Sequence, residues 1–152
     1  MADKFENYLK NEKSEYKTIA LTSNSYRNIE HSLNDNAINN NLATYGDALL
    51  KLALCEVLFK EKVKNITESK KNFESDEVLV KVIAKKYDLI KYIKYDSADV
   101  KIPQDYEYTG VKYKYIATAV EALLAAFYID NQRDFDLVIE IVREWKHVIG
   151  NN

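Results

Sequence analysis

Residues 41–59 read NLATYGDALLKLALCEVLF, and they predict a central, largely buried helix against which the rest of the chain packs. The segment holds no proline and one glycine, Gly46, and leucine or alanine recurs at almost every turn. Asp47 places an acid within this apolar run. Carboxylates are rarely fully buried unless they are paired or bind a metal. Asp47 therefore needs a partner.

A candidate partner lies in a second apolar segment, residues 115–129, which read YIATAVEALLAAFYI. Glu121 is its only charged residue, and Thr118 lies three residues earlier on the same side of the expected helix. The five alanines of this segment make a thin surface that another helix can approach closely. Two readings of the lone acids stay open: they act together as a site, or each is neutralised by a local lysine such as Lys51 or Lys114.

Length and composition favour a single all-α domain spanning residues 1–152. The chain has 152 residues, 3 glycines and 1 proline, and long stretches carry helical periodicity. The polar N-terminus does not read as a secretory signal, and no run approaches the ~20 apolar residues of a membrane span. The single cysteine, Cys55, is interpreted as a buried thiol. We expect a soluble cytoplasmic protein.

Shorter segments complete the expected arrangement. Helical structure is expected over 5–9, 16–21, 78–84 (with Ser75 as the N-cap), 87–93 and 134–148, and surface loops over 24–41 and 95–111. His31 lies in the first loop and is interpreted as a solvated residue, because no second histidine or cysteine stands at metal-ligand spacing.

The formal net charge of −2 argues against a protein that coats nucleic acid nonspecifically. Lysines are nevertheless clustered in three segments, 60–71, 81–94 and 112–114. Such clusters can neutralise phosphates, and they can equally be a solvated helix face.

Four segments together resemble the catalytic domain of ribonuclease III, in the same order along the chain. ALTSNSY (20–26), LATYGDAL (42–49), SDEVLVKVIAKKYDLIKYI (75–93) and ATAVEALLAAFYID (117–130) are similar to the family's ALTHxSY, LEFLGDAVL, SNExLAxxAxxLGLxxYI and ADxxEALIGAIYLD. The resemblance implies an all-α ribonuclease III-type helical bundle that dimerises through its signature helix, here residues 41–59.

The departures from the family pattern fall at the acids. The classical enzyme places four acids per subunit around magnesium, whereas this chain keeps Asp47 and Glu121 and has Asn40 and Thr118 at the other two positions. A further signature acid is replaced by Ala43. The compact Mini-III subfamily, which lacks a double-stranded-RNA-binding domain, resembles this chain at these positions. It implies that one Asp and one Glu can suffice, and we expect no such RNA-binding domain here. Segment 75–93 is closer to full-length ribonuclease III.

The resemblance also implies a chemistry. Asp47 and Glu121 are the expected catalytic residues and the ligands of Mg²⁺, for which Mn²⁺ can substitute, and the metal could activate a water for attack on an RNA phosphodiester. Asn40 and Thr118 could orient bound waters. The lysines that are candidates for RNA-phosphate contact are Lys51, Lys85, Lys86, Lys112 and Lys114.

The expected partners are a second copy of the chain and double-stranded RNA, so that two sites act across one duplex, one per strand. The resemblance leaves room for a ribosomal or other RNA-binding helper protein. Two alternatives to an endoribonuclease stay open: an inactive ribonuclease III-like module that binds or scaffolds structured RNA, and a plain helical dimerisation domain.

Overall fold

Helices dominate the computed structural model, which describes residues 3–151. The α-helices are α1 (Lys4–Asn11), α2 (Glu15–Ala20), α3 (Asn40–Lys60), α4 (Ile66–Glu74), α5 (Asp76–Val78), α6 (Lys114–Asp130) and α7 (Phe135–Gly150). A π-helix, η3 (Leu79–Ala84), continues α5, and short 3₁₀ turns occupy η1 (Asn24–Asn28), η2 (Asp35–Ala37), η4 (Leu89–Tyr92), η5 (Gln104–Tyr106) and η6 (Val111–Tyr113). Residues 3–151 form no strand, only an isolated bridge between Thr22 and Lys94. The all-α prediction is confirmed.

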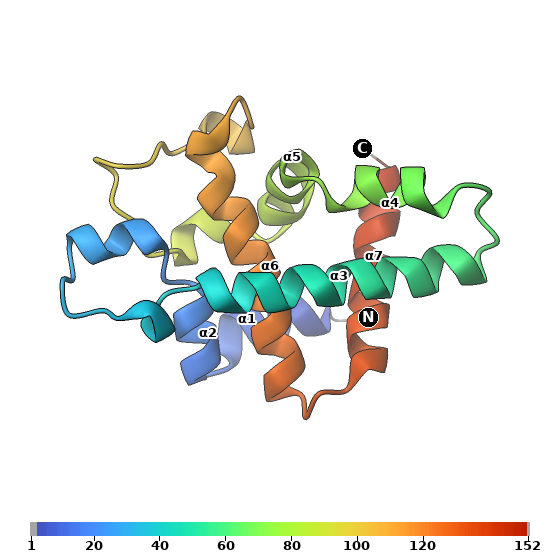
Figure 1. Cartoon of the computed structure of the whole chain (residues 1–152), viewed down its shortest axis with the longest axis horizontal. Coiled ribbons are helices and arrows are strands. Elements are labelled where there is room, and N and C mark those ends of the chain that lie inside the picture. Colours follow the sequence, from blue (N-terminus) through green and yellow to red (C-terminus); the bar gives the residue numbers. More distant parts are fainter. Residues whose placement is uncertain (1–2, 152) are drawn as a thin grey trace.

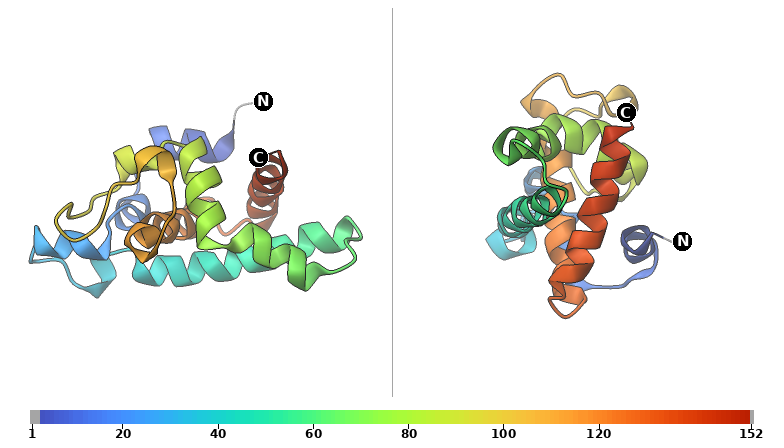
Figure 2. Two further views of the ribbon diagram at one scale, coloured as in Figure 1. Left: turned by 90° about the horizontal axis from the view of Figure 1, so that it is seen from above. Right: turned by 90° about the vertical axis from the view of Figure 1, so that its right-hand side faces the viewer.

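Helix α6 is the centre of the molecule. Its alanines are buried, and so are the large residues Ile116, Leu123 and Phe127. Figure 1 shows α3 crossing α6, and the two views of Figure 2 show α6 between α3 on one side and α1 on the other. The apolar segments 41–59 and 115–129 are thus the two long helices that the sequence predicts, each one residue longer at both ends.

The two long helices touch backbone to backbone at Gly46. A Cβ atom added there would lie 1.7 Å from the carbonyl oxygen of Glu121, closer than any side chain can come. Only glycine therefore allows this crossing. The close approach that Gly46 allows is therefore made to α6 of the same chain, and not to a second copy of the chain.

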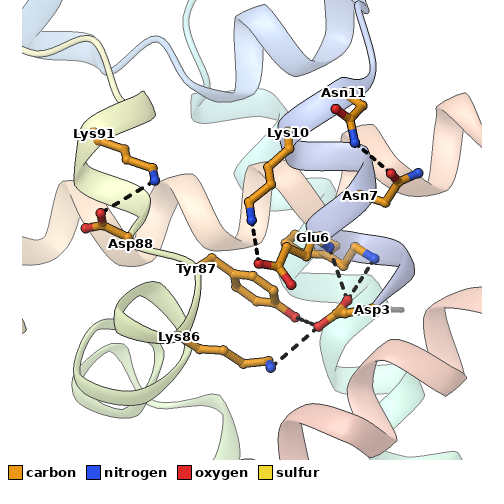
Figure 3. Close-up of polar contacts among 10 residues, drawn as sticks. Asp3, Glu6, Asn7, Lys10, Asn11, Lys86, Tyr87, Asp88 and Lys91 are labelled. Atoms are coloured by element: carbon orange, nitrogen blue, oxygen red, sulfur yellow. Dashed lines mark hydrogen bonds and ion pairs between the residues drawn. The ribbon is translucent and has the colours of Figure 1, made fainter. Parts of the chain in front are cut away.

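Helix α1 is fastened to the core by one carboxylate (Figure 3). Asp3 caps α1 by accepting from the backbone N–H groups of Phe5 and Glu6. Its Oδ2 also accepts from the Tyr87 hydroxyl at 2.8 Å, and that hydroxyl in turn accepts from Trp145 Nε1 at 3.0 Å. Burial raises the pKa of Tyr87 above its usual value, so the phenol stays a donor. One chain of hydrogen bonds thereby joins α1, the segment after η3, and α7.

Several local expectations differ from the structure. Helix α4 was not predicted, and the expected helix over 78–84 is mostly π-helical, although Ser75 does cap its start by accepting from the Val78 N–H. Segment 87–93 forms only the 3₁₀ turn η4, after Asp88 in the left-handed conformation.

Cys55 is half-buried rather than buried, because it lies toward the exposed side of α3. His31 is exposed, as expected. Among the helices of the described residues, none has both the length and the apolar character that crossing a bilayer requires.

Candidate active site

The crossing of α3 and α6 brings the two lone acids together. Asp47 follows Gly46 directly on α3, and Glu121 is the residue whose carbonyl Gly46 approaches on α6. Their carboxyl groups lie close enough to hydrogen-bond when one of them carries a proton. We call Asp47 and Glu121 the acid pair. Both residues are half-buried, so the pair is packed against the bundle on one side and open on the other.

Four carboxyl groups lie around this crossing, those of Asp47, Glu74, Asp76 and Glu121, and three of them have a lysine partner. The ion pairs are Asp47–Lys51 at 2.8 Å, Glu74–Lys70 at 2.9 Å and Asp76–Lys114 at 4.0 Å. Within residues 3–151, Glu121 forms no ion pair of its own. The fourth carboxyl group is therefore the one without a neutralising cation.

The pKa values of the pair move in opposite directions as a result. Burial, followed by the hydrogen bond and the charge of Asp47, raises the pKa of Glu121 to about 8. Burial opposes ionisation of Asp47 too, but the hydrogen bonds from Lys51 and Glu121 outweigh it and lower the pKa of Asp47. The pair is therefore arranged to hold one proton, which resides on Glu121.

Asn40 and Thr118 lie on the same helices as the acids. Thr118 is half-buried one turn before Glu121, and its hydroxyl donates to the Lys114 carbonyl oxygen at 3.1 Å. Its oxygen can still accept a hydrogen bond from a water. Asn40 is exposed at the first residue of α3, two turns before Asp47. Both side chains are neutral, so neither adds negative charge to the acid pair.

The candidate phosphate-binding lysines do not gather in one place. Lys51 contacts Asp47 directly, and Lys114 reaches Asp76, whose charge acts on Glu121. Lys86 instead pairs with Asp3 at 3.6 Å, next to α1, which lies across α6 from α3 (Figures 2 and 3). The remaining two, Lys85 and Lys112, are exposed, and Lys85 pairs with Asp105.

Sequence reasoning did not place Lys70, Glu74 and Asp76 at this site. They come from α4 and the start of α5, and their charges act on Lys51, Asp47 and Glu121. In the sequence, Asp76 is simply an acid at the start of a helix. The local pattern holds no signal for its role, because it depends on how α5 packs against α6.

The donor set of the acid pair fits a hard divalent cation. Mg²⁺ and Mn²⁺ prefer oxygen ligands, and Mg²⁺ is commonly held by one or two carboxylates while it keeps several waters. Within residues 3–151 Glu121 has no ion-pair partner, and it lies against a second carboxyl group, so a cation there would replace the proton that Glu121 holds. No third Asp, Glu, His or Cys among residues 3–151 comes close enough to complete a larger ligand cluster.

Known proteins resemble this chain in the region of the acid pair. The ribonuclease III domain family matches residues 40–132, which include both acids. A protein named Ribonuclease 3 from Clostridium tetani (strain Massachusetts / E88) is 33% identical over 132 residues, which cover 84% of this chain and 49% of that relative. Ribonuclease 3 from Clostridium kluyveri is 32% identical over 115 residues, or 74% of this chain and 44% of the relative. The chain thus spans about half the length of the curated relatives it matches.

Proposed function

This chain belongs to the ribonuclease III family, and on that basis we propose that it is a magnesium-dependent endoribonuclease that cleaves double-stranded or structured RNA as a homodimer. The observation that carries the proposal is the acid pair. Asp47 and Glu121 both lie within the matched residues 40–132, and the crossing at Gly46 brings the two acids side by side.

Asp47 and Glu121 would hold the metal, with Mn²⁺ as a substitute. When bound, Mg²⁺ would supply a polarised water and a positive charge beside the departing oxygen of a phosphodiester. Asn40 and Thr118 would orient waters through neutral oxygens. With two acids in place of four, metal binding should be weaker than in the classical site. The partial exposure of the Asp47 side chain (37% exposed) should weaken it further.

An RNA duplex suits the surroundings of the pair. A-form RNA is recognised by shape, 2′-hydroxyls and phosphates, so the site needs cations but no base-reading groups. Lys51 and Lys114 lie beside the acids and would contact phosphates there. Lys86 lies across the bundle, so any phosphate that it contacts is far along the RNA or on another molecule.

Assembly into a homodimer is supported by one exposed face of α3. Tyr45, Leu52 and Phe59 are spaced seven residues apart and are 39%, 53% and 77% exposed. We call these three residues the exposed stripe of α3. Residues at this spacing share a helix face, and a repeated apolar face of this kind is typical of a self-complementary interface. A second copy seated there would bring a second acid pair to the same duplex.

The second candidate is an inactive module that uses the same fold to bind or scaffold structured RNA. It is favoured by the replacement of two family acids with Asn40 and Thr118, and by the ion pair that Lys51 already forms with Asp47. A helical dimerisation domain without RNA affinity would use only the exposed stripe of α3.

The experiment incubates the pure protein with a labelled RNA duplex, with and without Mg²⁺. Cleavage only with Mg²⁺ supports the enzyme, and a gel shift in Ca²⁺ without cleavage would favour the RNA-binding module. If the protein gives neither cleavage nor a gel shift, the helical dimerisation domain is the remaining interpretation.

Variants assign the activity to the acid pair. Asp47→Asn and Glu121→Gln are nearly isosteric and should each lower the cleavage rate by at least about 100-fold while the fold is kept. Glu140→Gln, an exposed acid on α7 that pairs with Lys4, is the matched control and should keep wild-type activity. Wild-type cleavage by either acid-pair variant would contradict the assignment.

A further inference from the structure

Lys51 stands where a cation bound to Asp47 would compete with it. Its ammonium lies 2.8 Å from Asp47 Oδ2, and the carboxyl group of Asp47 also lies beside that of Glu121. Asp47 therefore lies between a lysine of its own helix and the acid of the opposite helix. Any divalent cation that the two acids share must meet the positive charge of Lys51.

The ion pair of Lys51 with Asp47 is of an exposed, weak kind. The pair joins residues four apart on the surface of α3, and the lysine side chain is 46% exposed. Exposed pairs of this kind are weak, because water and salt screen them and a long side chain must be held still. A divalent ion attracted by two carboxylates is the stronger competitor for Asp47.

Apart from Glu121, which would share the metal with Asp47, the acids near Lys51 within residues 3–151 already have a lysine partner. Glu74 faces Lys51, but Lys70 already neutralises Glu74 at 2.9 Å, in an ion pair whose side chains are only 22% and 16% exposed. Asp76 is reached by Lys114. A lysine displaced from Asp47 would therefore stay near the acid pair without a protein partner, as a cation available to an anionic ligand.

We propose that Lys51 is a displaceable counter-cation: it neutralises Asp47 when no metal is bound, and it moves to an RNA phosphate when a divalent cation takes its place. This inference rests on the proposed function, since it assumes that the acid pair binds a divalent cation. Its consequence is coupling. RNA that holds Lys51 away from Asp47 strengthens metal binding, and metal binding in turn releases Lys51 for RNA, by the same factor.

The test measures Mn²⁺ binding directly, without RNA, from the electron paramagnetic resonance signal of the free ion. Lys51→Met should tighten Mn²⁺ binding about threefold to tenfold, because it removes a competing charge. Lys51→Arg keeps that charge and should bind Mn²⁺ no more tightly than the wild type. Lys10→Met is the matched control, because Lys10 forms a pair of the same spacing and order with Glu6 at 2.9 Å on α1, and it should change nothing.

A second readout separates this role from simple electrostatics. In single-turnover cleavage of an RNA duplex at saturating Mn²⁺, Lys51→Met should be slower or require more RNA than the wild type, although it binds the metal more tightly. If the wild type binds Mn²⁺ and Lys51→Met binds it equally or more weakly, the proposed role of Lys51 is overturned, while the metal site itself stands. Wild-type Mn²⁺ binding that is absent, or that survives in Glu121→Gln, would overturn the metal site and this inference with it.

Discussion

At the scale of single residues, Glu121 is a side chain that destabilises the metal-free fold. The bundle buries a carboxyl group beside another one and, within residues 3–151, forms lysine ion pairs with three neighbouring acids but not with this one. A stability optimum would place a neutral side chain there. The cost is understandable if the group awaits a cation, because sites that bind charge are typically unfavourable when empty.

The stability of the metal-free protein should therefore fall as pH rises. The pKa of Glu121 is raised from 4.5 to about 8 in the fold, so the folded chain holds a proton that the unfolded chain releases at lower pH. Stability is lost between about pH 4.5 and pH 8. Allowing for the partial exposure of the side chain, we expect the free energy of unfolding of Glu121→Gln to exceed that of the wild type by about 1–3 kcal/mol at pH 8. At pH 4 the difference should be small. Thermal melts in EDTA at both pH values measure this, and an equal difference at the two would contradict the assignment.

Gly46 makes the crossing possible, and its replacement should show this. Gly46→Ala would place a methyl group 1.7 Å from the Glu121 carbonyl oxygen, so α3 and α6 must move apart. We expect the free energy of unfolding to fall by about 3 kcal/mol or more and cleavage to be lost, because backbone atoms cannot move out of the way as the end of a flexible side chain can. Gly150→Ala is the control, since no atom lies within 4 Å of its added Cβ. Denaturant unfolding compares the two, and a Gly46→Ala protein as stable as the wild type would refute the crossing.

At the scale of elements, what could be predicted depended on how much of an element's stability is written in its own sequence. α3 and α6 were predicted because their long apolar runs without proline leave no alternative to a buried helix. α4 was missed because ITESKKNFE is short and mostly polar, so that packing on α3 holds it rather than its own pattern. The π-helix η3 could not be predicted, since its hydrogen-bond register leaves no compositional signal.

The exposed stripe of α3 should decide the oligomeric state. Leu52→Lys places a charge in the middle of the proposed interface, and because Leu52 is exposed in the single chain, folding should be nearly unaffected. We expect wild type to be a dimer at micromolar concentration and Leu52→Lys to be a monomer that cleaves RNA poorly. Ile102→Lys, equally exposed but outside the stripe, should remain dimeric. Sedimentation velocity distinguishes the forms, and a monomeric wild type would contradict the dimer.

At the scale of the whole molecule, the order of the four family-like segments predicted the bundle and which two acids would meet. It could not predict their environment. The ion pair of Lys114 with Asp76, and the link from Asp3 through Tyr87 to Trp145, join residues far apart in sequence, and only the packed fold brings them together. The resemblance likewise leaves open whether two acids suffice, because that depends on how strongly this environment attracts a metal.

The most direct measurement is therefore cleavage of an RNA duplex against Mg²⁺ concentration, for wild type, Thr118→Asp and the double variant Asn40→Glu, Thr118→Asp. Added carboxylates attract the cation more strongly, although in its absence they repel the acid pair and one takes up a proton. We predict that the wild type cleaves at millimolar Mg²⁺ and that Thr118→Asp needs less of the metal. An inert wild type that gains activity only when both acids are restored would contradict the account and assign the chain to the scaffold alternative.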